Sequence, residues 1–92
     1  MEILAHVVAQ KPVRSIESKK EAGKKITVVD LVVSTGLDTF LCTAFDSVAS
    51  RLVGSPLNAG QLGEFRLSCS VSGGADDAYR YQSVRLIDYS VL

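Results

Sequence analysis

One stretch of the chain alternates strictly between two kinds of side chain. In residues 64–71, apolar side chains occupy the odd positions and polar or charged ones occupy the even positions. Because successive side chains on a strand point to opposite faces, this pattern predicts a strand with one buried face, on which Phe65 belongs to the core. No stretch longer than about ten residues shows the apolar spacing of a long helix. The sequence therefore predicts a mostly β protein.

The remaining elements follow from the same reasoning. Further strands are predicted over 2–10, 25–34, 39–45 and 78–89, and Pro12 should bend the first strand before it continues through 13–16. A helix of two to three turns is predicted from Asp46, as N-cap, to the C-cap Gly54. The changed apolar spacing at 81–84 suggests a β-bulge there. Residues 17–24 and 72–77 are predicted loops.

Composition limits the size and the chemistry of the protein. A chain of 92 residues, 47% hydrophobic and 22% charged, should form a single globular domain over 1–92. Its thin core makes a homodimer or homo-oligomer plausible as the working state. Two cysteines, 42 and 69, are expected to be buried thiols in a cytoplasmic protein. No apolar run approaches the roughly 20 residues that span a bilayer, so no membrane partner is expected.

No residue pattern indicates catalysis or a bound cofactor. The single histidine, His6, lies in an apolar strand without a nucleophile motif, and no phosphate-binding glycine loop is present. Two cysteines without a Cys-x-x-Cys spacing do not make a metal site with one histidine, and the neighbouring carboxylates Asp76 and Asp77 point apart. We expect a protein that is not an enzyme, with no catalytic residue, no metal and no cofactor.

Three strands, a short helix and two strands follow one another along the chain. This order predicts a five-stranded OB-fold Greek-key barrel with one short helix between strands 3 and 4. From Lys25 onward the chain resembles the single-stranded-DNA-binding and primosomal replication proteins of bacteria and phage. The resemblance rests on the strand after Gly23, the strand that ends at Phe45 and leads into a helix, the segment 60–71 with its leading glycine, and the last strand over 81–88.

The resemblance implies a single-stranded nucleic-acid partner, DNA above all, in replication or recombination. OB-folds bind on the face of strands 2 and 3 and through two flanking loops, with cations on phosphates and aromatic rings on bases. Lysine and arginine outnumber carboxylates by six to three in residues 1–25, which include the first of these loops. The predicted nucleic-acid contacts are Arg14, Lys19, Lys20, Lys24, Lys25, Phe40, Arg66, Tyr79, Arg80 and Tyr81.

Several alternatives remain open from the sequence. The lysine segment could be a solvated loop, and the tyrosines could form cross-strand pairs or a dimer interface. Phe40 and Phe45 have opposite parity, so at most one of them faces the binding platform, and the sequence does not decide which. The alternative function is a protein–protein assembly module on the same barrel. It would associate through the strand 26–33, which is apolar on both faces, and through the last strand.

Overall fold

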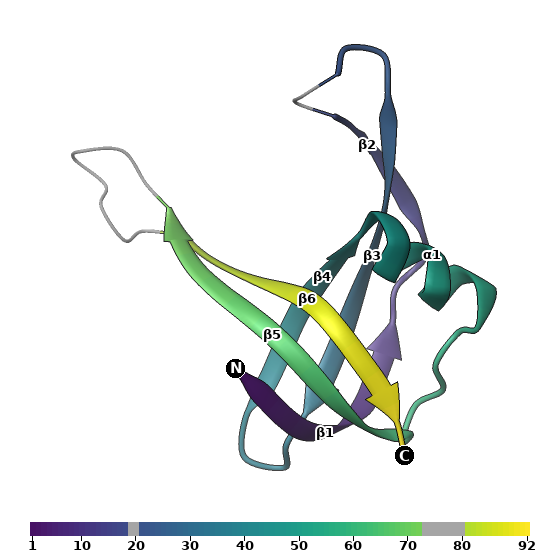
Figure 1. The fold of residues 1–92 in the computed structure, drawn as a ribbon. Coiled ribbons are helices and arrows are strands. Elements are labelled where there is room, and N and C mark those ends of the chain that lie inside the picture. Colours follow the sequence, from purple (N-terminus) through teal and green to yellow (C-terminus); the bar gives the residue numbers. More distant parts are fainter. Residues whose placement is uncertain (19–20, 73–80) are drawn as a thin grey trace.

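The computed structural model describes residues 1–18, 21–72 and 81–92, with the side chains of residues 71, 72, 81 and 82 outside the description. The elements follow one another along the chain in the predicted order (Figure 1). They are β1 (Glu2–Gln10), β2 (Arg14–Glu17), β3 (Lys25–Ser34), β4 (Thr39–Phe45), α1 (Asp46–Gly54), β5 (Leu62–Ser72) and β6 (Tyr81–Val91).

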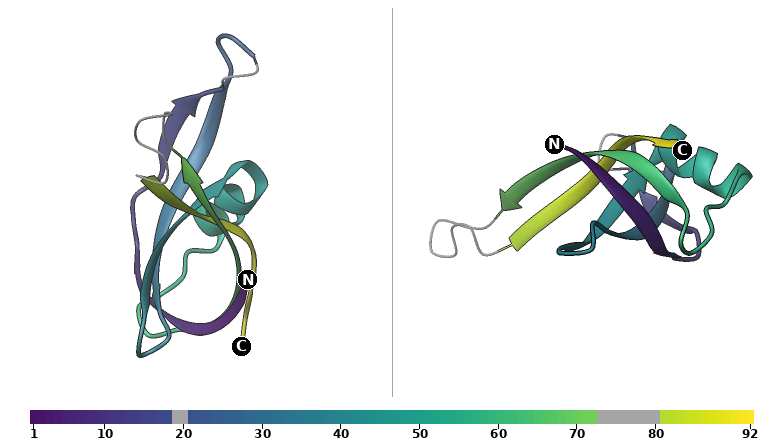
Figure 2. Two further views of the ribbon diagram at one scale, coloured as in Figure 1. Left: turned by 90° about the vertical axis from the view of Figure 1, so that its left-hand side faces the viewer. Right: turned by 90° about the horizontal axis from the view of Figure 1, so that it is seen from below.

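The strands close into a barrel. They are hydrogen-bonded in the order β1-β5-β6-β4-β3-β2, and an additional pairing of β1 with β3 completes a ring of five strands. Figure 2 shows this ring nearly end on in its left view. Strands β1 and β2 are two halves of one bent strand, separated at Pro12, as the sequence predicts. With α1 between the third and fourth strands of the ring, the topology confirms the predicted OB-fold barrel.

Alternate residues of the strands fill the barrel. Leu31 and Val33 of β3 and Leu67 of β5 are fully buried, and Phe65 is 1% exposed, which confirms its predicted place in the core. Helix α1 packs against β3, β4 and β6 and adds Ala49 and Leu52 to the same cluster. Because the odd positions of β3 point inward, its even positions form an outer face. No helix of the described segments has the length and apolarity to cross a membrane.

The bulges lie elsewhere than the sequence suggests. Pairing of β5 with β6 is continuous through Tyr81 to Val84, so the bulge predicted there is wrong. The register shifts instead where Arg66 pairs with Asp88 and Leu67 with Leu86. Ile87 is the extra residue, and it lets both Leu86 and Tyr89 pack towards the core. A second shift, in β1 between Val7 and Ala9, accompanies the crossing of β1 from β5 to β3.

Two local expectations are also corrected. Phe45, in extended conformation, is the N-cap of α1, while Asp46 is its first residue, with a positive φ of 52° and no capping hydrogen bond. Gly54 is the last helical residue, and Ser55 caps the helix end. Cys69 is exposed rather than buried. Strand β1 pairs with β5 only as far as Arg66, so this part of β5 continues beyond the barrel wall as a hairpin with β6 (Figure 1).

Candidate functional site

The outer face of β3 and β4 continues onto β2 and β6, so four neighbouring strands form one surface. Val28 pairs with Phe45, Asp30 with Thr43 and Val32 with Leu41, so alternation gives these side chains a common outward direction. Strand β2 extends the surface on one side, because Arg14 pairs with Val28 and Ile16 with Ile26. Strand β6 extends it on the other side, through the parallel pairing of Thr43 with Arg85.

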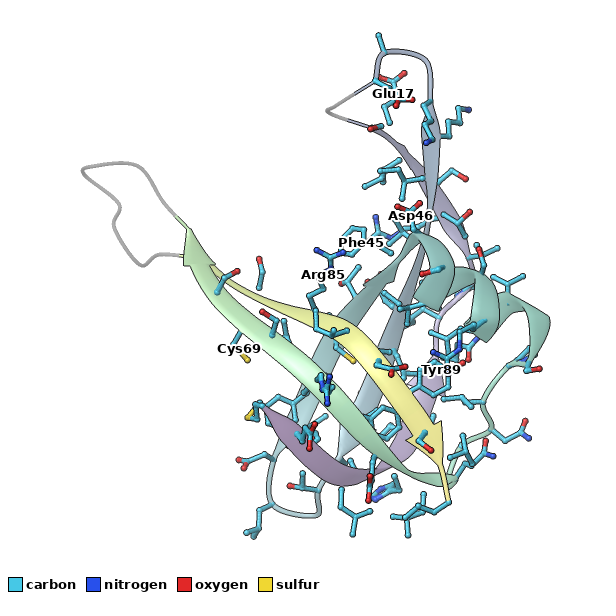
Figure 3. The ribbon with its side chains drawn as sticks, in the orientation of Figure 1. Glu17, Phe45, Asp46, Cys69, Arg85 and Tyr89 are labelled. Atoms are coloured by element: carbon cyan, nitrogen blue, oxygen red, sulfur yellow. The ribbon has the colours of Figure 1, made fainter. Side chains whose placement is uncertain are left out.

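A hollow of about 590 Å³ opens at one end of this face, between the β2–β3 hairpin and β6. Its walls combine apolar, aromatic and charged side chains. Figure 3 shows Arg85 reaching from β6 towards Phe45, with Asp46 beside Phe45 and Glu17 on the hairpin beyond them. The lining residues are Ile16, Glu17, Ser18, Glu21, Lys24, Ile26, Phe45, Asp46 and Arg85.

Phe45 and Arg85 form a stacked pair at the base of the hollow. The Arg85 guanidinium carbon lies 5.1 Å from the centre of the Phe45 ring. An arginine within about 6 Å of an aromatic ring is attracted by its negative face, which orients both groups. Arg85 is exposed and Phe45 is partly exposed, so both the guanidinium and the ring are accessible from solvent. Purine and pyrimidine rings stack on aromatic rings and on guanidinium planes alike.

A polar cluster occupies the centre of the face. The Arg14 guanidinium donates to both carboxylate oxygens of Asp30, at 3.2 and 3.3 Å, and the Thr43 hydroxyl donates to Asp30 Oδ1 at 2.7 Å. Partial burial by itself raises the pKa of Asp30, but the hydrogen bonds from Arg14 and Thr43 outweigh it and hold that pKa below its usual value. The carboxylate therefore stays ionised, and its charge is compensated by Arg14.

The lysines predicted from the sequence lie at the hairpin end of this face, as far as the structure describes them. Lys24 lines the hollow and lies 3.8 Å from Glu21, and Lys25 is exposed opposite Glu17. Arg14 lies on the same face, although Asp30 engages its guanidinium. Lys19, Lys20, Tyr79 and Arg80 lie outside the described residues, and so does the side chain of Tyr81, whose backbone begins β6.

Two other predicted contacts lie away from the face. Phe40 shares the parity of the buried Cys42 and Ala44 and packs against the core. Arg66 lies on β5, which borders neither β3 nor β4, and its guanidinium donates to Glu2 of β1 at 2.7 Å. Neither side chain therefore lies on this face, and their role as nucleic-acid contacts stays a prediction from the sequence. Phe40 faces inward because small apolar residues follow it at every second position, whereas Arg66 turns away because its strand crosses the opposite wall.

Arg85 is not among the contacts predicted from the sequence, which also leaves the choice between Phe40 and Phe45 open; the structure turns Phe45 outward. A signal for both was present. Threonines at 39 and 43 mark the odd positions of β4 as the outer ones, which turns Phe45 outward, and Arg85 lies between the apolar Val84 and Leu86. Only the pairing of β4 with β6 brings the two side chains together, and that contact joins residues 40 positions apart.

The closed five-stranded barrel, its helix and its partly polar outer face define the protein as an OB-fold, a class that binds oligonucleotides or oligosaccharides on this face. Among solved structures, it is similar to the second OB-fold domain of replication protein A from Methanococcus maripaludis, determined in solution. The TM-score is 0.73 at 16% sequence identity, and the match covers 99% of this chain and 81% of that one. No protein-family model matches the chain, and no curated protein does.

Proposed function

We propose that the chain is a non-enzymatic single-stranded DNA-binding protein acting in replication or recombination, with the outer face of β3 and β4 as its binding surface. The observation that carries the proposal is the Phe45–Arg85 pair. It offers an aromatic ring and a guanidinium for stacking at the hairpin end of the class's usual binding face. The likeness to an OB-fold domain of a replication protein supports the same process.

Charge supports a backbone contact beside the stacking surface. Lys24 and Lys25 project from the β2–β3 hairpin, and Arg85 crosses the face from β6. Single strands are held by cations that follow the phosphates while their bases stack on planar side chains. We include Lys19 and Lys20 in the interface as predictions, together with Tyr79, Arg80 and Tyr81 of the second hairpin. Arg14 contributes through the donors that its pairing with Asp30 leaves open.

Apolar side chains extend the surface along the barrel. Leu41 is 58% exposed beside the partly buried Val32, further along the same face from Phe45. Sugar rings and base faces are the parts of a single strand that gain from such contacts, since its phosphates remain solvated. The track therefore runs from the lysines past the Phe45–Arg85 pair towards Leu41. Cys42 and Cys69 are free thiols, which is consistent with a function in the reducing cytoplasm.

Substitution of the aromatic residue tests the proposal. Phe45→Ala should weaken binding of a fluorescently labelled mixed-sequence oligonucleotide by about 5- to 150-fold, because each stacked base contributes roughly 1 to 3 kcal/mol. Fluorescence anisotropy at low salt measures the change. Binding by the unaltered chain should be visible at protein concentrations up to about 100 μM, the range of weak non-specific association.

Matched substitutions separate this surface from general charge effects. Arg85→Gln should also weaken binding, whereas Arg66→Gln removes the same charge from β5 and should leave the affinity within about twofold, since surface changes away from a site have small effects. The proposal fails if the unaltered chain gives no anisotropy change, or if Phe45→Ala and Arg66→Gln behave alike. Urea unfolding of each variant confirms that the fold is retained.

The assembly alternative uses the same strands. It requires the outer face of β3 to be apolar enough to meet a second copy, but this face carries the Arg14–Asp30 ion pair at its centre. Burying a charge pair costs several kcal/mol per ion before the attraction between the ions is regained. This favours a solvated, polyanion-binding role for the face. Self-association through another surface stays a prediction from the thin core.

A further inference from the structure

The hollow beside Phe45 is rich in carboxylates for a surface that binds a polyanion. Glu17, Glu21 and Asp46 line it, against Lys24 and Arg85 as cations. Lys24 lies 3.8 Å from Glu21. Within residues 1–18, 21–72 and 81–92, no ion pair joins Glu17 or Asp46 to a cation. Both side chains are exposed, so both are free to accept hydrogen bonds from a ligand.

These carboxylates determine which part of a nucleotide enters the hollow. Three carboxylates against two cations give the lining a negative balance, so a phosphate is less favourable there than a neutral base. A base carries no charge, and it matches the apolar and planar walls that Ile16, Ile26 and Phe45 provide. Phosphates therefore pass outside the hollow, along the lysines, while one base turns inward onto the Phe45–Arg85 pair.

The bases differ in what they offer to an ionised carboxylate, which only accepts hydrogen bonds. Guanine presents two adjacent donors on its Watson–Crick edge, the N1–H and the N2 amino group. Adenine and cytosine each offer one amino group there, and thymine offers a single N–H between two carbonyl oxygens that repel a carboxylate. An acceptor-only rim around a stacking surface therefore favours guanine most and thymine least.

We propose that the hollow is a base-selective subsite that prefers guanine, with the two oxygens of one carboxylate, that of Asp46 or of Glu17, accepting its N1–H and N2 amino hydrogens. This inference rests on the proposed single-stranded DNA-binding function. Asp46 is well suited to the task because it adjoins Phe45 in the chain, so the stacking group and the acceptor move as one unit. Glu17 faces the same hollow from the opposite wall, on β2 (Figure 3).

Oligonucleotides with a single variable base test the preference. Labelled oligo-dT of about 12 nucleotides, within the usual site size of an OB-fold, carries one central dG, deoxyinosine, dA, dC or no replacement. The strand can slide, so the best base will settle in the hollow. We expect the dG strand to bind about 5- to 100-fold more tightly than plain oligo-dT, in line with base discrimination by paired hydrogen bonds. Deoxyinosine lacks only the N2 amino group and should lose about tenfold relative to dG.

Amide substitutions assign the preference to the two carboxylates. The combined change Asp46→Asn and Glu17→Gln should lower affinity for the dG strand and raise affinity for plain oligo-dT, because the acceptors and the negative charge disappear together. A merely repulsive acidic rim would instead raise affinity for every strand alike. Glu64→Gln, an exposed carboxylate on β5, is the matched control. Glu17→Gln alone, at an exposed strand position, separates the two carboxylates: loss of the dG preference assigns it to Glu17, and its retention assigns it to Asp46.

Each outcome bears on a distinct claim. Absence of binding to every strand at low salt overturns the proposed function. Binding with equal affinities for dG, deoxyinosine and dT overturns the guanine subsite and leaves the function intact. A dG preference that survives both amide substitutions overturns the assignment to Asp46 and Glu17.

Discussion

At the scale of single residues, the two cysteines show how position on the barrel controls reactivity. Cys42 is fully buried, and its thiol donates to the Leu31 carbonyl oxygen at 3.2 Å. Burial raises the pKa of the Cys42 thiol to about 11, because a thiolate loses its hydration inside the barrel. Cys69 is exposed on the part of β5 that continues beyond the wall. The thiolate is the reactive species, so the two residues should differ sharply.

Thiol labelling measures this difference. At pH 8 the folded chain should react rapidly at one thiol, Cys69, and the second should react only after denaturation, because Cys42 is both inaccessible and protonated. Cys69→Ser should abolish the rapid phase, whereas Cys42→Ser should retain it. Rapid reaction of two thiols in the folded protein would contradict the burial of Cys42.

At the scale of elements, Asp30 ties three strands together. Its carboxylate on β3 accepts hydrogen bonds from Arg14 on β2 and Thr43 on β4. The short β2 is held in the sheet by β3 alone, so this bidentate contact also fixes the base of the lysine-bearing hairpin. Helix α1 is fixed in a similar way, because Arg51 donates to Asp88 at 2.7 Å and its guanidinium lies 4.4 Å from the Tyr89 ring centre.

The Thr43 hydrogen bond gives a pH-dependent test. Thr43→Val should reduce the free energy of unfolding by about 1 kcal/mol at pH 7, at the low end for a bond to a charged group because Asp30 is partly exposed. The pKa of Asp30 in the folded protein is depressed below its ordinary value of 3.8. The stabilisation is therefore complete above about pH 5 and is lost as pH falls through the folded-state pKa.

Urea unfolding of the unaltered chain and the Thr43→Val variant at several pH values measures this. The stability difference between them should shrink as pH falls below the ordinary pKa of 3.8, because Asp30 takes up a proton in the unfolded chain before it does so in the folded protein. Thr39→Val, a control threonine at the exposed start of the same strand, should show no such trend. A difference that stays constant down to pH 2 would exclude the Thr43–Asp30 bond as its cause.

At the scale of the whole molecule, the formal net charge is zero, so attraction to a polyanion must come from local grouping. Arg14, Lys24, Lys25 and Arg85 lie on one outer face or at its end, while Arg51 and Arg66 are engaged with Asp88 and Glu2 elsewhere. Such grouping should make the proposed binding weak, short-range and salt-sensitive. Locally grouped charges attract a distant polyanion less strongly than the net positive charge of a basic protein does.

The salt dependence of binding measures how many phosphates the protein neutralises. Neutralising about four phosphates on a single strand should give a slope near −3 when log affinity is plotted against log salt concentration. The combined change Lys24→Gln and Lys25→Gln should reduce the magnitude of the slope by about 1.4, since each phosphate contact on single strands contributes about 0.7. Arg66→Gln should leave the slope unchanged. Equal slopes for all three proteins would remove the lysines from the interface.

The local sequence determined most of the secondary structure and the topology class. The alternation in 64–71, the bend at Pro12 and the punctuation around the helix depend on steric and solvation preferences of neighbouring residues, which a sequence displays directly. The strands, the helix and the bend at Pro12 are confirmed with small shifts in element bounds, whereas the predicted helix caps and the burial of Cys69 are not. The sequence also predicted the lysine-bearing loop between two strands in the first third of the chain.

Tertiary structure decided what depends on pairing between distant strands. Barrel closure brought Arg85 over Phe45, turned Arg66 away to Glu2, and left Cys69 outside the wall. The bulge at Ile87 moved the inward face by one position, so Tyr89 packs inward after Leu86. A one-residue shift in register reverses which face a side chain occupies, and register is set by contacts across the whole barrel rather than by neighbours in sequence. The stacking pair and the carboxylate-lined hollow exist only because that closure is made.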